Sequence, residues 1–143
     1  MIDTSVLVAG LIENHEFHAL ARSLLVASSS NRIPGIVLAE AWSVLRRPPW
    51  SFDAATVDLA LTPWMTEERM IATPASAYVS VLRAGRSLNL GGNVHDLLIA
   101  YTCAAAGLPL ATLDRRQAAL AATLPGLAVN LLLPDEPGSA AEE

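Results

Sequence analysis

The sequence predicts a single α/β domain built around a mainly parallel sheet. Short apolar and β-branched runs alternate with segments in which apolar residues recur at helical spacing. The apolar runs are continuous rather than alternating, which is typical of strands buried on both faces of a parallel sheet. The length of 143 residues and the hydrophobic share of 52% suit one domain with one core.

Local signals place the elements in order along the chain. Pro48 and Pro49 stop the second expected helix, Asp53 is a good N-cap for the third, and Gly107 follows the fifth as its C′ residue. A run of serines closes the first helix, and residues 91–93 form a loop. The expected strands span residues 1–8, 33–37, 70–73, 108–113 and 127–133, and the expected helices span 15–28, 37–47, 53–64, 75–88, 96–106 and 115–124.

The charge balance leaves room for a polyanionic partner. The formal net charge is −5, but four of the fourteen acids lie in the Pro/Gly/Ala-rich end, residues 134–143, which we expect to be a flexible acidic tail after a domain of residues 1–133. All nine basic residues are arginines. An arginine fork can grip two phosphate oxygens, so the body of the chain suits a phosphate-bearing substrate if cations neutralise part of its acids.

The composition also indicates the cellular compartment of the protein. No apolar run reaches the roughly 18 residues of a membrane span, and the apolar start has no basic leader segment and carries Asp3 inside it. Cys103 is the only cysteine, which excludes an internal disulfide and a cysteine-based zinc site. These features predict a cytoplasmic protein without a membrane partner.

Four acidic residues stand out by their positions. Asp3 and Asp114 lie at or near the ends of expected strands, and Glu40 and Asp96 lie near the starts of expected helices. Taken singly, the three aspartates are explained equally well as helix N-caps, and Glu40 as an exposed helix residue. Because ligands gather outside the carboxyl ends of parallel strands, the four together predict one acidic site at that edge of the sheet.

A shared acidic site needs a cation. Carboxylates packed together repel one another, and at least one stays protonated unless a metal ion neutralises them. Hard oxygen ligands favour Mg²⁺ or Mn²⁺. A metal held by few protein ligands can activate water and stabilise charge that develops on phosphorus, so the expected reaction is hydrolysis of a phosphate ester.

Four short motifs resemble those of the PIN-domain ribonucleases. They are IDTSVL (residues 2–7), LAE (38–40), HDLLIA (95–100) and LATLD (110–114), and their order and spacing are similar to those of VapC-type toxins of bacterial toxin–antitoxin pairs. The resemblance covers residues 1–133. It implies a three-layer α/β/α domain with Mg²⁺- or Mn²⁺-dependent endoribonuclease activity, inhibition by a cognate VapB-type antitoxin, and a homodimer.

The resemblance also assigns residues. It implies that Asp3, Glu40, Asp96 and Asp114 form the catalytic, metal-binding cluster, with Ser5 and Thr112 as hydroxyls that bond these carboxylates or metal-bound water, and Asn93 as a supporting amide one turn before Asp96. Two features depart from the family pattern. Only two residues precede Asp3, and Arg115, Arg116 and Gln117 follow Asp114 where some members carry a further acid.

Two functions fit these residues. The first is the ribonuclease toxin, and the second is a catalytically weak PIN scaffold that binds an antitoxin and supports repression of its own operon. A haloacid-dehalogenase-type phosphatase is excluded, because its motif needs a second Asp two residues after the first and this chain has Ser5. The tryptophans, Trp42, Trp50 and Trp64, are expected in the core or at an interface rather than as exposed base-stacking rings.

Overall fold

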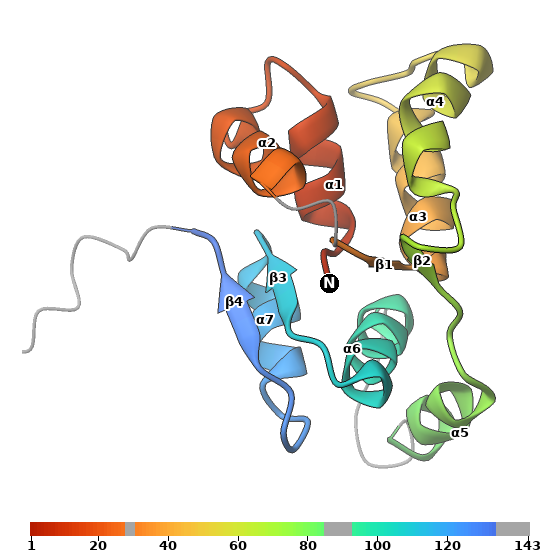
Figure 1. Cartoon of the computed structure of the whole chain (residues 1–143), viewed down its shortest axis with the longest axis vertical. Coiled ribbons are helices and arrows are strands. Elements are labelled where there is room, and N and C mark those ends of the chain that lie inside the picture. The colour runs from red at the N-terminus through yellow and green to blue at the C-terminus, as the bar shows by residue number, and fades with distance from the viewer. Residues whose placement is uncertain (28–30, 85–92, 134–143) are drawn as a thin grey trace, which may run out of the picture.

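Short strands and longer helices alternate along the chain (Figure 1). The computed structural model describes residues 1–27, 31–84 and 93–133. The helices are α1 (Thr4–Leu11), α2 (His18–Ala27), α3 (Gly35–Leu45), α4 (Ala54–Leu61), the 3₁₀ turn η1 (Thr62–Trp64), α5 (Ala75–Ala84), α6 (Val94–Ala106) and α7 (Arg115–Ala121). The strands are β1 (Ile33–Pro34), β2 (Met70–Ile71), β3 (Leu110–Thr112) and β4 (Val129–Leu131).

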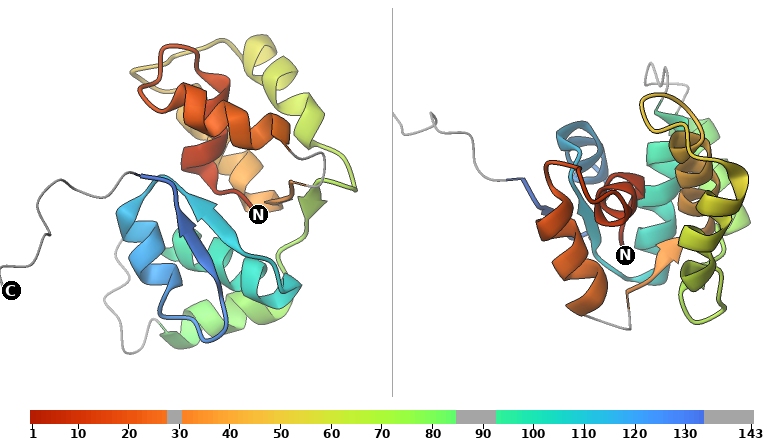
Figure 2. Two further views of the ribbon diagram at one scale, coloured as in Figure 1. Left: turned by 60° about the vertical axis from the view of Figure 1, so that its left-hand side comes forward. Right: turned by 90° about the horizontal axis from the view of Figure 1, so that it is seen from above.

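All strand pairs are parallel, as the continuous apolar runs predicted. β1 pairs with β2 and β3 pairs with β4. Residues 1–3 lie between the two pairs, because Ile2 forms a parallel bridge with Ala111 and its N–H donates to the carbonyl of Arg32 at 3.1 Å. The order across the molecule is therefore β2, β1, residues 1–3, β3, β4, with helices on both sides (Figure 2).

The first strand is much shorter than expected. Residues 1–8 were predicted as a short strand that runs into a turn or a helix start, but α1 already begins at Thr4, and Asp3 caps it by accepting a hydrogen bond from the Val6 N–H. The helix is buried on most of its surface, and a fully buried helix and a fully buried strand give the same unbroken apolar run. Here tertiary burial outweighs the β-propensity of the valines.

Most of the remaining elements are shorter than predicted, whereas α6 begins two residues earlier than predicted, at Val94. The strand expected at 33–37 ends at Pro34, and α3 begins at Gly35, two residues earlier than predicted. Asp53 caps α4, and Gly107 ends α6 in the left-handed conformation at φ +64°, both as predicted. The expected end of α5 at residue 88, the loop glycines 91 and 92, and the tail at 134–143 lie outside the described residues.

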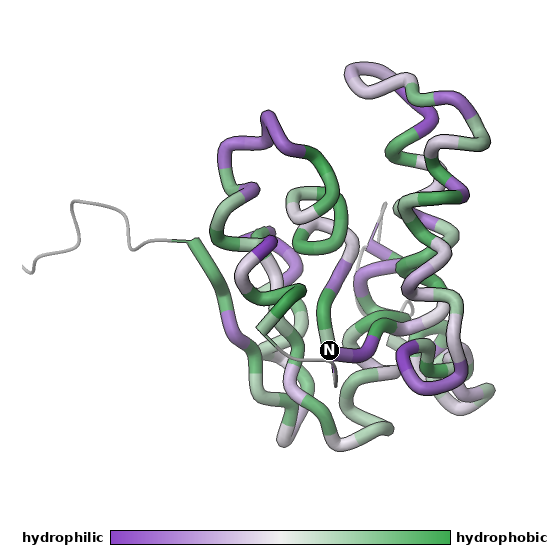
Figure 3. The backbone as a smooth tube through the Cα atoms, turned by 45° about the horizontal axis from the view of Figure 1, so that its top comes forward, coloured by the Kyte–Doolittle hydropathy of each residue, from purple (hydrophilic) through white to green (hydrophobic). Residues whose placement is uncertain are grey.

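The core is centred on α1. This helix packs against α2, α3 and β3, and Gly10 gives α2 its close approach, because a Cβ at that position would lie 2.3 Å from Cδ1 of Leu25. Hydrophobic stretches run along the helices and strands in Figure 3, while hydrophilic residues mark the loops that follow α1 and α3. No helix within the described ranges is both long and apolar enough to cross a membrane.

Candidate active site

The four acids singled out in the sequence line the same cleft. Its volume is about 540 Å³, and Asp3, Glu40, Asp96 and Asp114 all contribute to its wall. They come from four separate parts of the fold: residues 1–3, which lie in space between β1 and β3, helix α3, the first turn of α6, and the β3–α7 connection. The convergence predicted from the parallel strand order is therefore present in the structure.

Asp3 is the most deeply placed of the four, with an exposed fraction of 4%. Its Oδ1 accepts hydrogen bonds from the Ser5 hydroxyl at 2.7 Å and from the Val6 N–H at 3.0 Å, and its Oδ2 accepts from the Thr112 hydroxyl. Burial raises the pKa of Asp3 above its ordinary value, and these three hydrogen bonds oppose that shift. The predicted bonds from Ser5 and Thr112 to a carboxylate are present.

The same two hydroxyls bind the end of β3. Ser5 Oγ accepts a hydrogen bond from the Leu113 N–H at 2.9 Å, and Thr112 Oγ1 accepts one from the Asp114 N–H at 2.9 Å. Each hydroxyl thus donates to Asp3 and accepts from the backbone that leads to Asp114. This network fixes the two carboxylates in the same neighbourhood, although they are far apart in sequence.

Asp114 is also the N-cap of α7. Its Oδ1 accepts from the backbone N–H groups of Arg116 at 2.7 Å and Gln117 at 3.2 Å. The capping role weighed for Asp3 and Asp114 is thus present for both residues. It does not compete with a place in the cleft, because the two cap bonds of Asp114 use Oδ1 and leave Oδ2 outside the cap.

Glu40 has partners that sequence reasoning missed. Its Oε2 accepts a hydrogen bond from the Thr4 hydroxyl, and its Oε1 lies 3.7 Å from Nδ1 of His95. Thr4 follows Asp3 directly and His95 precedes Asp96, so both partners lie inside the acidic motifs. Adjacency to a motif acid was the only signal that could have found them.

The pKa of Asp96 is raised by its surroundings, which include the other three acids. Asp96 lies in the first turn of α6 rather than at the N-cap, which is Asn93, so the capping explanation for Asp96 is wrong. Partial burial is the main reason that its pKa is raised, and the charges of Glu40, Asp114 and Asp3 raise it further, while His95 opposes them. The carboxylates of Glu40, Asp114 and Asp3 are therefore close enough to Asp96 to disfavour its ionised form.

The residues fit a hard divalent cation by their chemistry. Four carboxylates on one cleft give the oxygen donors that Mg²⁺ and Mn²⁺ prefer, and a cation would relieve their repulsion. Across the described parts of the chain, no three acidic, histidine or cysteine side chains are already arranged to hold one ion. The side chains would have to turn towards a bound ion, and Asp3, held by three hydrogen bonds, is the fixed member of the set.

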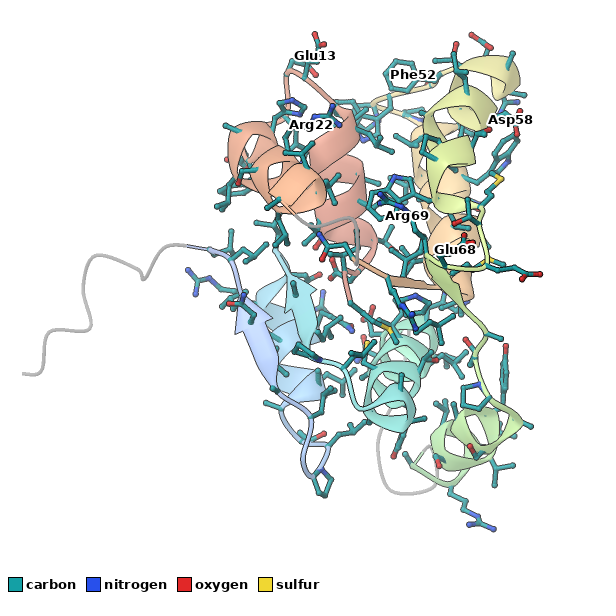
Figure 4. All side chains as sticks on the ribbon, in the orientation of Figure 1. Glu13, Arg22, Phe52, Asp58, Glu68 and Arg69 are labelled. Atoms are coloured by element: carbon teal, nitrogen blue, oxygen red, sulfur yellow. The ribbon has the colours of Figure 1, made fainter. Side chains whose placement is uncertain are left out.

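Other residues named from the sequence divide between the cleft and the rest of the fold. Asn93 does not line the cleft and makes no side-chain cap, whereas Arg115 lies on the cleft wall. Trp64 is buried, with the guanidinium of Arg69 4.6 Å from its ring centroid, and Figure 4 shows Arg69 between α1 and α4. Trp50 was expected in the core or an interface; it packs, partly buried, against the core and also lines the cleft.

Trp50 belongs to an aromatic wall formed by His15, Phe17 and Trp50. The His15 ring lies 6.0 Å from that of Phe17 and 6.1 Å from that of Trp50, measured between centroids. All three line the cleft and are partly buried. Their segments follow α1 and α3, far apart in sequence, so no local pattern could have joined them.

Comparison with known proteins agrees with this geometry. Residues 1–122 match the family model of the PIN domain. The chain belongs to the PIN domain family. Its structure is similar to that of VapC20 from Mycobacterium tuberculosis, described as a sarcin-ricin loop cleaving toxin, with a TM-score of 0.69 over 88% of this chain and 96% of that one. At 16% identity this similarity establishes the PIN fold alone, and it confirms the predicted α/β architecture. No curated protein matches the chain.

Proposed function

We propose that this PIN domain is a Mg²⁺- or Mn²⁺-dependent endoribonuclease of the VapC type, neutralised by a VapB-type antitoxin. One observation carries the proposal: carboxylates from four separate segments line one cleft, where the charges of the other three help to raise the pKa of Asp96. Such an arrangement costs stability unless it binds a cation, so its presence supports a metal-dependent function rather than a structural one.

Asp3 is held in place by its hydrogen bonds, whereas Glu40 can change its hydrogen-bond partners. Asp3 is held by Ser5 and Thr112 and provides a carboxylate that does not need to reorganise. Glu40 shares its two oxygens between Thr4 and His95, and exchange of these partners would free it to turn towards an ion. A divalent cation held by these acids would supply Lewis-acid chemistry for phosphodiester hydrolysis.

RNA is the substrate class that the cleft suits best. Arg115 on its wall can pair with a phosphate, and the aromatic wall offers ring faces beside the acids. A homodimer, an antitoxin that covers the cleft and a cytoplasmic location complete the proposal by similarity to VapC toxins. They rest on the family resemblance of the four motifs.

The decisive experiment compares two aspartate variants on a single-stranded RNA with added Mn²⁺. We expect the wild-type protein to cleave the RNA, chelation by EDTA to stop cleavage, and Asp96→Asn to abolish it. Asp58→Asn is the matched control, because Asp58 is an exposed acid on α4 that does not line the cleft. Equal cleavage by the wild type and Asp96→Asn would assign the activity to a contaminant and reject the enzyme.

The alternative is a scaffold that binds an antitoxin without significant catalysis. The absence of a preassembled three-ligand metal site among the described residues is the observation that favours it. This alternative predicts tight complex formation with an antitoxin and no Mn²⁺-dependent cleavage of any RNA. The same purified protein therefore distinguishes the two.

A further inference from the structure

Gln117 is a buried polar residue on the wall of the acidic cleft. Its exposed fraction is 2%, and it lies on α7, three residues after Asp114. Neither the acidic motifs nor the capping of α7 requires a glutamine side chain there. A fully buried amide in that position therefore needs a separate explanation.

The side chain joins the helix of one acid to the cap of another. Gln117 Nε2 donates a hydrogen bond to the backbone carbonyl of Asp96 at 3.1 Å, which links α7 to the first turn of α6. Its backbone N–H donates to Oδ1 of Asp114 at 3.2 Å. One residue thus contacts both the main chain that carries Asp96 and the carboxylate of Asp114.

The other end of the amide is unsatisfied. Only Nε2 can donate to the Asp96 carbonyl, so the orientation of the amide is fixed, and Oε1 is then buried without a hydrogen-bond partner among the described residues. A buried acceptor left unpaired destabilises the fold, and an apolar side chain of the same shape avoids that cost. Stability alone therefore does not account for a glutamine at this place.

We propose that Gln117 is a positioning residue that sets Asp96 relative to Asp114 for binding of the divalent cation. This inference rests on the proposed function of the same cleft. Without the bond from Nε2, the first turn of α6 loses a hydrogen bond to α7, and the backbone that carries Asp96 is held less firmly relative to the cap formed by Asp114. Groups that orient metal-binding side chains in this way typically change metal affinity by about 10- to 100-fold.

The test replaces the amide by an apolar side chain of similar length. For Gln117→Met we expect the melting temperature of the metal-free protein to stay the same or rise, and the Kd for Mn²⁺, measured by calorimetry, to weaken by about tenfold or more. We expect kcat for RNA cleavage to fall by a similar factor with little change in KM. If the Met variant does not fold, Gln117→Leu gives the same comparison.

Thr102→Val is the matched control. Thr102 is a buried polar residue on α6 whose hydroxyl donates to the Leu98 carbonyl at 2.6 Å, and it does not line the cleft. This variant should lower the melting temperature and leave the Kd for Mn²⁺ unchanged. A Gln117→Met protein that melts early but binds Mn²⁺ and cleaves RNA like the wild type would overturn the inference. Absence of Mn²⁺ binding and cleavage in the wild type would overturn the proposed function instead.

Discussion

The hydroxyl of Thr112 donates a hydrogen bond to Oδ2 of Asp3, a residue 109 positions earlier in the chain. The bond is buried, and the same hydroxyl accepts from the Asp114 N–H. We expect Thr112→Val to lower the free energy of unfolding by about 1–3 kcal/mol, because it leaves a buried carboxylate with one partner fewer. Urea unfolding at neutral pH measures this loss.

Thr112→Ser is the control for that prediction, because it keeps the hydroxyl and removes only a methyl group. It should recover most of the lost stability. Equal unfolding curves for the Val variant and the wild type would show that the bond contributes nothing to folding.

The raised pKa of Asp96 predicts how stability depends on pH. Its folded-state pKa lies above the ordinary value of 3.8, so between these two values the folded protein binds more protons than the unfolded chain. The free energy of unfolding should therefore fall as pH rises through that window, and the ionised state should stay destabilised at neutral pH. Asp96→Asn should flatten this dependence and be more stable than the wild type at neutral pH.

The measurement is a series of thermal melts of metal-free protein from acidic to neutral pH. Asp58→Asn should follow the wild-type curve, because Asp58 is exposed on α4 and does not line the cleft. A melting temperature of Asp96→Asn that rises and falls in parallel with that of the wild type would contradict the prediction.

Trp50 and Trp42 offer a matched pair for testing RNA contact. Trp50 lines the cleft, while Trp42 is exposed on α3 outside it. If a base stacks on the aromatic wall, Trp50→Leu should weaken the binding of a short RNA by several-fold or more, since stacking contributes about 1–3 kcal/mol per base. Trp42→Leu should bind as the parent does.

Binding for this pair is best measured by fluorescence anisotropy in an Asp96→Asn background, where the RNA should remain intact. Comparable melting temperatures of the two tryptophan variants would exclude a trivial loss of folding. The same loss of affinity in both would remove the aromatic wall from the substrate site.

Gly10 tests the contact between α1 and α2. A Cβ at residue 10 would lie 2.3 Å from Leu25 Cδ1, so Gly10→Ala forces this leucine or the helix to shift. We expect a loss of about 1–3 kcal/mol in the free energy of unfolding, as for other overpacked cores. At Gly35 the nearest atoms lie 3.7 Å from the added Cβ, so Gly35→Ala should be tolerated.

Sequence reasoning predicted the parallel pairing of the strands better than the lengths of the elements. The parallel order, the cap at Asp53 and the end of α6 at Gly107 depend on local signals that the sequence carries directly. The extent of the first strand cannot be predicted from local signals, because a buried helix and a buried strand need the same apolar residues. Here the cap formed by Asp3 decides in favour of the helix.

In the site, too, local sequence signals predicted some features, while others depend on tertiary packing. The acids could be found because Asp3, Asp96 and Asp114 stand near the ends of apolar elements and because all four lie in motifs that resemble those of PIN domains; Glu40 itself lies in the middle of α3. Their hydrogen-bonding environment could be found only in part, since Ser5 and Thr112 lie within the motifs, whereas the bridge made by Gln117 depends on how α6 and α7 meet. A side-chain contact between two packed helices has no periodic signature in the sequence.

Residues 1–3 lie between β1 and β3, so a segment that precedes both strands in sequence occupies the middle of the finished sheet. A nascent chain cannot close the cleft until Thr112 and Asp114 have emerged, because both belong to its wall or its hydrogen-bond network. Folding of the whole domain therefore waits for contacts of long sequence separation, which form slowly. Until β3 and Asp114 are in place, the four carboxylates cannot line one cleft, so the acidic site forms only when the fold around it is complete.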